Sequence, residues 1–237
     1  MFISEELLIT CAKEFDMNLS KDIVLKFDTY AKELVSYNEK VNLTAITEPD
    51  DIVIKHFADS LAFFKYSGIG KGNSVADVGT GAGFPGVPLK IAFPEVEITL
   101  ADSLNKRIKF LDEVVAELGL EKVTTIHARA EELARNKEHR ESYDLVVSRA
   151  VANLSTLGEY CIPFVKMGGN FISYKSGEVE EEVNAAEKAI KILGGQIKDV
   201  YKFDLSDQKR SFVTIEKIKT TPKTYPRKAG TPSKDPL

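Results

Sequence analysis

A glycine-rich segment follows a short apolar run between Val75 and Gly86, and it holds the strongest chemical signal in the chain. The order of apolar residues, glycines and more apolar residues predicts a strand, a tight turn and a helix. Glycines let the backbone turn sharply and let a ligand approach within contact distance. A turn without a ligand would also use glycine, but Gly79, Gly81 and Gly83 fall within five residues. This density favours a ligand-binding loop.

The spacing of these glycines distinguishes between two ligands. Gly81–Gly86 matches the dinucleotide signature GxGxxG, but the match begins too far from the strand. Counted from Gly79, the third glycine position is Phe84, whose bulk would block the helix–strand packing that a pyrophosphate site requires. The spacing fits better a loop that passes the methionine end of S-adenosylmethionine. Asp77, at the strand end, could then meet the ammonium group, directly or through water, or it could cap the turn.

Polar residues follow three further predicted strands. Asp102 lies 23 residues after Gly79, where a carboxylate can accept hydrogen bonds from ribose hydroxyls or can cap the next helix. Ala130 and Glu131 follow the third strand, where the adenine of a nucleoside cofactor would lie, although Glu131 could also be solvated. Arg149 follows the fourth strand and could hold a carboxylate or a phosphate, or form a structural ion pair.

A second group of polar side chains is expected near the substrate. His56, Asp59 and Ser60 have helical spacing, so they share one helix face beside an apolar stripe. They could line the substrate mouth and orient the reacting base, or they could be a satisfied cluster on the helix surface. Lys175 ends the fifth predicted strand and could contact a phosphate or simply be solvated.

The composition is that of a folded protein. Hydrophobic residues make up 43% and charged residues 29% of the 237 residues, which fits one enlarged domain. The longest uncharged stretch, Val78–Leu89, is too short to cross a membrane, and the acidic start does not resemble a secretory signal. Cys11 and Cys161 lie far apart and form no metal-ligand pattern. We therefore expect a cytoplasmic, monomeric protein without a metal or a membrane partner.

Strand and helix patterns alternate after a helical N-terminal region. This alternation predicts a doubly wound, mostly parallel α/β sheet of the Rossmann-like class I methyltransferase type. The last two strands have no helix between them and should pair antiparallel. A helix is expected over Leu154–Lys166. The seven expected strands are Ser74–Val78, Glu97–Ala101, Val123–His127, Tyr143–Ser148, Asn170–Tyr174, Gln196–Phe203 and Phe212–Ile218.

Charge and composition divide the chain into three parts. Residues 1–66 form a helical extension, residues 67–218 a cofactor-binding core, and residues 219–237 a basic, proline-rich tail. The whole chain carries a net charge of −4, which argues against indiscriminate coating of nucleic acid. In the tail, Tyr225 could stack on a base while Arg227 and Lys228 meet phosphates. A solvated tail without a ligand is the alternative.

Several motifs together resemble those of the bacterial small-subunit ribosomal RNA methyltransferase G family, also called glucose-inhibited division protein B. The resemblance covers nearly the whole chain. The matching segments are Tyr37-Asn38, Val41-Asn42-Leu43-Thr44, His56-Phe57-Ala58-Asp59-Ser60, Asp77 to Gly86, Asp102-Ser103, Lys106-Arg107, Ser148-Arg149-Ala150 and Tyr225 to Pro232.

The resemblance implies methylation of guanine N7 at nucleotide 527 of 16S ribosomal RNA, free or within the small ribosomal subunit, with S-adenosylmethionine as donor. It implies cofactor contacts by Gly79, Phe84, Ala130, Glu131 and Arg149, and low-level streptomycin resistance when the activity is lost. Guanine N7 carries no proton that must be removed. No general base is therefore expected, and catalysis should rest on positioning and electrostatics.

Three other functions remain open from the residues alone. The chain could methylate another RNA or a small molecule, or it could be an NAD-dependent enzyme. It could also be a non-catalytic binding module on the same fold. The intact glycine loop, Asp102 and Arg149 argue against a binding module. The basic tail argues against a small substrate, which would give no reason for it.

Overall fold

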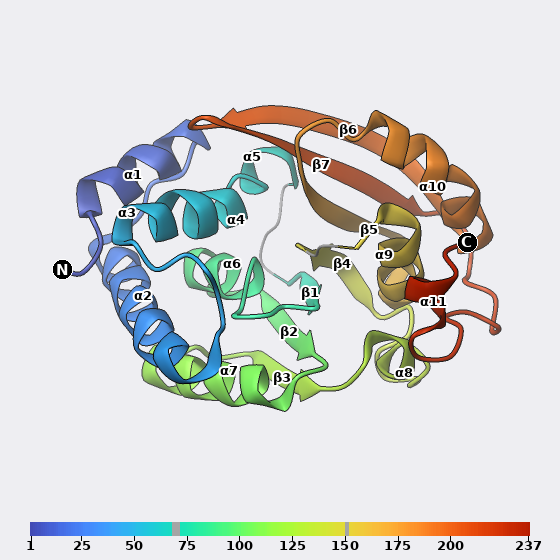
Figure 1. Cartoon of the computed structure of the whole chain (residues 1–237), viewed down its shortest axis with the longest axis horizontal. Coiled ribbons are helices and arrows are strands. Elements are labelled where there is room, and N and C mark those ends of the chain that lie inside the picture. The colour runs from blue at the N-terminus through green and yellow to red at the C-terminus, as the bar shows by residue number, and fades with distance from the viewer. Residues whose placement is uncertain (68–71, 150–151) are drawn as a thin grey trace.

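A single mixed sheet forms the centre of the computed structural model, which describes residues 1–67, 72–149 and 152–237 (Figure 1). Ala150, which ends the Ser148-Arg149-Ala150 motif, lies outside the described residues. Among the described residues seven strands pair in the order β3-β2-β1-β4-β5-β7-β6. They are β1 (Ser74–Val78), β2 (Glu97–Asp102), β3 (Val123–His127), β4 (Tyr143–Ser148), β5 (Val165–Ser176), β6 (Gly195–Leu205) and β7 (Gln208–Lys217).

The strand directions confirm the expected doubly wound topology. β1 lies between β2 and β4 and is parallel to both, and β3 and β5 continue the parallel order outward. β7 is antiparallel to both β5 and β6, as expected for strands that no helix connects. The chain therefore moves in opposite directions along the sheet from β1. In such sheets the crevice at the carboxyl ends, beside this reversal, is the usual ligand site.

Helices cover both faces of the sheet. The helices before and within the first half are α1 (Glu5–Glu14), α2 (Lys21–Val41), α3 (Pro49–Asp51), the π-helix η1 (Ile52–Ala58), α4 (Asp59–Leu61), α5 (Phe64–Ser67), α6 (Gly86–Ala92) and α7 (Asn105–Glu117). The later ones are α8 (Ala130–Leu133), α9 (Leu154–Cys161), the short 3₁₀ turn η2 (Ile162–Phe164), α10 (Glu180–Ile192) and α11 (Thr231–Lys234).

Alternating side chains of each strand enter two separate cores. Val75 packs with the N-terminal helices, α6 and α7, whereas Ala76 packs with α9 and α10. Val146 likewise lies in the second core between Leu145 and Val147, which lie in the first. This alternation follows from the two-residue period of a strand. The N-terminal helices thus complete the core on one face of the sheet.

The helix expected over Leu154–Lys166 is too long. α9 ends at Cys161, and Val165 is already the first residue of β5. Pro163 lies in the intervening 3₁₀ turn. Because proline has no N–H group and clashes with the preceding turn, it ends an α-helix. The apolar residues around it carried a helical pattern into the start of the strand.

The N-terminal region begins its long helix as expected but differs near His56. Ser20 caps α2, with its side-chain oxygen accepting a hydrogen bond from Ile23 N. Thr47 does not cap the next helix, because Glu48 is its N-cap residue. A π-helix follows, and π turns are rare and frequent at functional sites. Within the described residues no helix is long and apolar enough to cross a membrane.

Candidate active site

The glycine loop leaves β1 with its backbone in conformations that favour glycine. Gly79 and Gly81 have φ of +73° and +62°, and a Cβ at either position would meet no atom within 4 Å. Asp77 fixes the loop from beneath, because its Oδ2 accepts hydrogen bonds from the Thr80 hydroxyl at 2.7 Å and from Gly86 N at 2.8 Å. The loop is therefore held in place with open space at its glycines.

Asp77 is fully buried behind this loop. Burial raises its pKa to about 7, against the hydrogen bonds from Thr80 and Gly86, which lower it. Its Oδ1 has no hydrogen-bond partner among the described residues, and Asp77 is not one of the residues that line the adjacent cavity. Its observed contacts match the turn-capping alternative. Contact with an ammonium group stays a prediction.

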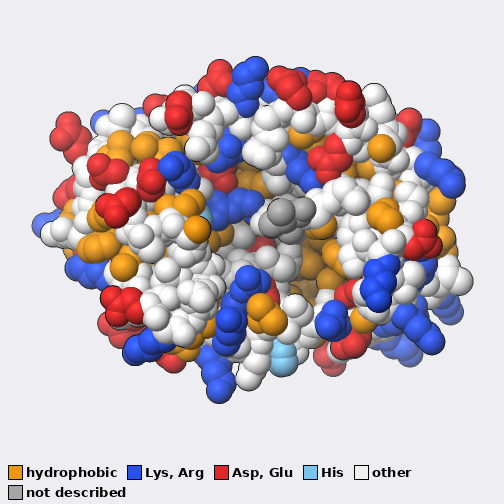
Figure 2. Space-filling view, in the orientation of Figure 1, with side chains coloured by type: hydrophobic (Ala, Val, Ile, Leu, Met, Phe, Trp, Pro, Cys, Tyr) orange, Lys and Arg blue, Asp and Glu red, His pale blue; other side chains and the backbone are white. Residues whose placement is uncertain are grey.

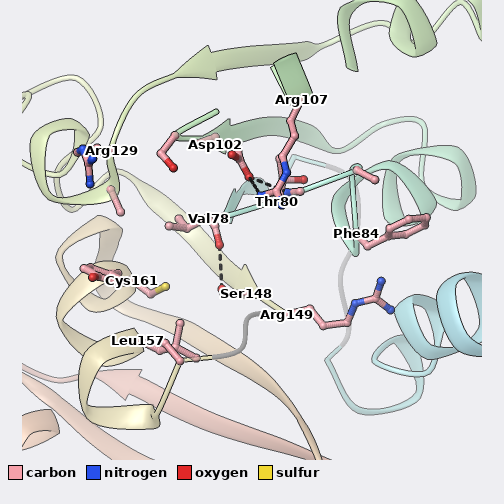
Figure 3. A pocket seen from close by; sticks show the side chains of 18 of the residues that line it. Val78, Thr80, Phe84, Asp102, Arg107, Arg129, Ser148, Arg149, Leu157 and Cys161 are labelled. Carbon is pink, nitrogen blue, oxygen red and sulfur yellow. Dashed lines mark hydrogen bonds and ion pairs between the residues drawn. The ribbon is translucent and has the colours of Figure 1, made fainter. Parts of the chain in front are cut away.

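A cavity of about 580 Å³ opens at the carboxyl ends of β1, β2 and β4 (Figure 3). It lies beside the reversal of strand order, where a doubly wound sheet binds its ligand. The structure brings most of the predicted cofactor residues to its wall. These are Gly79, Gly81, Phe84, Asp102, Ala130, Glu131 and Arg149.

Asp102 is held at the end of β2 by donors from three places. Its Oδ1 accepts a hydrogen bond from Leu104 N at 2.9 Å, as the helix-capping alternative required. Its Oδ2 accepts hydrogen bonds from Gly81 N at 3.0 Å and from Arg107 at 3.2 Å. The carboxylate thus joins the glycine loop to α7 and fixes the shape of this end of the cavity.

Glu131 is buried at the other end of the cavity. It is 5% exposed, so it is not the solvated side chain that one alternative described. Its Oε1 accepts a hydrogen bond from Gly230 N of the C-terminal tail at 2.8 Å. The tail therefore contributes directly to the position of a cavity-lining carboxylate.

Arg149 extends from the end of β4 toward η1, beside Phe84 (Figure 3). Its NH1 donates to Asp59 Oδ2 at 2.7 Å and to Lys55 O at 3.1 Å, and its NH2 donates to His56 Nδ1 at 3.0 Å. Its guanidinium carbon lies 4.9 Å from the centre of the Phe84 ring. A guanidinium has more N–H groups than these three. Donors therefore remain for a ligand.

His56 is a neutral imidazole in this arrangement. Burial and the neighbouring Arg149 lower the pKa of His56 to about 3. Because a guanidinium can only donate, His56 Nδ1 must accept, and Nε2 carries the proton that it donates to Thr44 Oγ1 at 2.9 Å. The ring stacks on Phe84 with centroids 4.2 Å apart. Its expected place on a helix surface is wrong, since His56 is 8% exposed.

Asp59 and Ser60 are also buried, at 4% and 0% exposed. Asp59 lies between two arginines: Oδ2 accepts from Arg149, and Oδ1 accepts from Arg210 Nε at 2.9 Å. Ser60 donates to the carbonyl of His56 at 2.6 Å. The N-terminal region reaches the site because η1 packs over the end of β4. Asp59 orients Arg149 and Arg210.

Of the four predicted RNA contacts, Lys175, Tyr225 and Arg227 already contact other parts of the chain. Lys175 Nζ donates to Glu182 Oε1 at 2.6 Å and to Ala152 O at 2.8 Å. Arg227 forms an ion pair with buried Glu159 at 2.7 Å, and Tyr225 packs partly buried against the second core. Lys228 is exposed. The tail lies against the core along its length, and contact with RNA stays a prediction for all four residues.

Comparison with known proteins assigns the chain to a family. A family model described as rRNA small subunit methyltransferase G, GidB, matches residues 23–213. The chain belongs to this family. It is 51% identical over 227 residues to "Ribosomal RNA small subunit methyltransferase G" of Desulfitobacterium hafniense, covering 95% of this chain and 94% of that protein. The counterpart in Clostridium perfringens is 52% identical over 223 residues, 93% of each chain.

Solved structures show the same fold at low sequence identity. A 16S rRNA (adenine(1408)-N(1))-methyltransferase mutant from Catenulisporales acidiphilia gives a TM-score of 0.54 at 14% identity, covering 64% of this chain and 88% of that one. TrmN from Thermus thermophilus gives 0.54 at 15% identity, covering 70% and 53%. These similarities confirm the class I methyltransferase fold that the strand order predicted.

The GidB family site of this chain contains residues that its motifs did not indicate. A second cavity of about 820 Å³ adjoins the first and shares His56, Arg149 and Ala152 with it. Arg210 and Glu182 line this second cavity. Arg210 lies in β7, 151 residues from its partner Asp59, and no local pattern links residues so far apart. Within the described part of the chain no cluster of metal-ligating side chains occurs.

Proposed function

We propose that the protein transfers a methyl group from S-adenosylmethionine to N7 of guanine 527 in 16S ribosomal RNA, acting in the cytoplasm as a monomer. The observation that carries the proposal is the first cavity. It combines the glycine loop, two nucleoside-side carboxylates and Arg149 at the carboxyl ends of a methyltransferase sheet. Membership of the rRNA small subunit methyltransferase G family supports the RNA substrate.

The residues of this cavity fit S-adenosylmethionine. A volume of about 580 Å³ lies in the range of small-molecule sites. Carboxylates at Asp102 and Glu131 suit a cofactor with ribose hydroxyls and a net positive charge. One neighbouring structure, the adenine-1408 methyltransferase of Catenulisporales acidiphilia, is titled "with cosubstrate SAM", and its similar fold supports the assignment.

Each wall of the cavity would hold one part of the cofactor. Asp102 would accept hydrogen bonds from the ribose hydroxyls, and Ala130 with Glu131 would border the adenine. Gly79 and Gly81 leave room for the methionine end, and Arg149 has N–H donors left for its carboxylate. Phe84 holds Arg149 in place from one side. When bound, the cofactor supplies an electrophilic methyl group.

The chain's own residues need only position the acceptor. Guanine N7 offers a lone pair and no proton, so a general base is not required. His56 could not serve as a protonated acid near neutral pH, because its pKa lies at about 3. Cys161 lines the cavity, but burial raises the pKa of its thiol. It therefore stays a thiol and does not form a covalent adduct.

The direct test is methylation of small ribosomal subunits that lack this modification. The full-length protein and radiolabelled S-adenosylmethionine are incubated with these subunits and, separately, with protein-free 16S RNA. Borohydride and aniline then cleave the RNA chain at N7-methylguanosine. We expect label and cleavage at nucleotide 527. Label at another nucleotide or none would overturn the proposal, and tight NAD binding in calorimetry without binding of S-adenosylmethionine would contradict the cofactor assignment.

A further inference from the structure

The second cavity has the chemistry of a nucleotide site. It lies between η1, the start of α9 and the ends of β5 and β7, and it adjoins the cofactor cavity at His56, Arg149 and Ala152. Lys and Arg side chains border the hollow in the middle of the face shown in Figure 2. The cationic residues that line the cavity are Lys55, Arg149, Lys175 and Arg210.

The carboxylate of Glu182 is only half used. Its Oε1 accepts hydrogen bonds from Leu154 N at 2.6 Å and from Lys175 Nζ at 2.6 Å. Its Oε2 receives no hydrogen bond from the described residues, and the side chain is 30% exposed. Glu182 lines the second cavity. One oxygen is thus pinned by two protein donors, and the other is an acceptor left for a ligand.

Guanine presents two chemically opposite edges to such a site. N7 and O6 are acceptors on one edge, whereas the exocyclic N2 amine, with N1–H beside it, donates on the other. If N7 points to the cofactor cavity, O6 lies on the same side, near the donors of Arg149 and Lys175. The N1 and N2 donors then point away from the cofactor, toward a wall that must supply an acceptor.

We infer that the second cavity receives the target guanine and that Glu182 Oε2 accepts hydrogen bonds from its N1–N2 edge. This inference rests on the proposed function and adds a specificity-determining residue to it. Adenine has an acceptor at N1 and no N2 amine, so it would leave the carboxylate unpaired. Lys55 and Arg210 line the same cavity as cations and suit the phosphate of the same nucleotide.

The test exchanges one group on the substrate and one on the protein. Small subunits are reconstituted with RNA that carries guanosine or inosine at the target nucleotide, because inosine lacks only the N2 amine. For the wild-type protein, we expect kcat/KM to be about 10- to 100-fold lower with inosine, as for loss of a hydrogen bond to a charged group.

Glu182→Gln reverses the free position. The two donors at Oε1 will fix the amide oxygen there, which places the amide NH₂ where Oε2 was and turns the acceptor into a donor. We expect the ratio of guanosine to inosine kcat/KM to fall to about 1 in this variant. Exposed Glu181→Gln, the adjacent residue of α10, is the control and should keep the wild-type ratio.

The outcomes separate the inference from the proposed function. Equal kcat/KM of the wild type for guanosine and inosine would overturn the inference while guanine methylation stands, and this result needs no variant to fold. A Glu182→Gln protein that is less stable but keeps the wild-type ratio would show a purely structural role and also overturn it. No methylation of guanosine by the wild type would overturn the proposed function itself.

Discussion

Arg149 connects the parts of the site at the residue scale. Its guanidinium is fixed by Asp59, by the neutral ring of His56 and by the ring face of Phe84. It lines both cavities. A side chain so constrained is pre-organised, so little conformational entropy is lost when a ligand binds. We therefore expect this one residue to affect cofactor binding and acceptor position together.

Replacing Arg149 tests this directly. Arg149→Ala should raise the Kd for S-adenosylmethionine about 100-fold, because a charged hydrogen-bond donor is lost from a partly buried site. Asp59 keeps its bond to Arg210, which limits the structural damage. Titration calorimetry measures the effect, with exposed Lys109→Ala as the control. An unchanged Kd would remove Arg149 from the cofactor site.

The neutral state of His56 predicts a dependence of stability on pH. Its pKa is about 3 in the folded protein, against 6.5 as the ordinary value. The unfolded chain therefore binds more protons between these values, and the unfolding free energy must fall as pH drops through this window. From pH 7 to pH 5 this residue should lower the unfolding free energy by about 2 kcal/mol.

His56→Gln should remove that contribution while keeping an acceptor for Arg149. Urea unfolding of wild type and variant at pH 7 and pH 5 measures the difference. His127→Gln, at an exposed position, serves as the control. The hypothesis of a neutral buried imidazole fails if the wild type and His56→Gln lose the same free energy on acidification.

The motifs predicted the residues of the cofactor cavity but not the protein contacts between them. Gly79, Asp102, Glu131 and Arg149 follow strands, and the carboxyl ends of parallel strands meet at one edge of the sheet. Sequence reasoning could therefore place them together. The partners Gly230 and Arg210 come from distant segments whose packing is decided by tertiary contacts. Their pairing cannot be read from local spacing.

At the scale of elements, the glycine loop depends on how closely α2 and α7 approach it. Gly83 has φ of +102°, and a Cβ there would lie 2.6 Å from Val87 Cγ2 and 2.7 Å from the Tyr30 hydroxyl. That hydroxyl donates to Ala82 O. The third glycine of the loop therefore serves the packing of the loop against the N-terminal helices, whereas Gly79 and Gly81 adjoin open space.

Two glycine substitutions separate backbone strain from crowding. Gly119→Ala, with φ of +56° and no atom within 4 Å of the new Cβ, should lower the unfolding free energy by about 1 kcal/mol. Gly83→Ala should lower it by about 3 kcal/mol, because overpacking adds to the strain. It should also weaken binding of S-adenosylmethionine. Equal losses in urea unfolding would show that the loop can relax around the added methyl group.

The boundaries of elements were predictable where periodicity and turn residues agreed. β1, β3 and β4 have the residues expected for them. The junction of α9 and β5 did not, because both elements are buried and apolar there and only Pro163 marks the change. The π-helix at His56 has no sequence signature in this chain, since its apolar pattern resembles that of an ordinary helix.

At the scale of the whole molecule, the C-terminal tail is part of the folded core. Arg140 donates to the carbonyls of Thr221 and Tyr225, and Arg227 pairs with Glu159, whose side chain is 1% exposed. Composition alone indicated a basic, proline-rich appendage. Its charges are in fact divided between internal ion pairs and exposed residues such as Lys228, a distinction that sequence composition does not contain.

The ion pair of the tail should contribute strongly to stability. Arg227→Ala would leave Glu159 buried without its partner, which typically costs about 3–5 kcal/mol. Lys228→Ala, one residue on and exposed, should change the unfolding free energy by less than about 0.5 kcal/mol. Denaturant titration compares the two. Similar small effects would mean that the tail detaches from the core in solution.

The most direct test of the account is a crystal structure of the protein with S-adenosylmethionine or a non-reactive analogue. We predict that the ligand occupies the cavity between Gly79 and Arg149, with its ribose at Asp102 and its adenine beside Glu131. Its reactive end should face the second cavity, where Glu182 awaits the guanine. A ligand bound elsewhere, or an empty cavity at saturating concentration with Phe84 filling the space, would contradict it.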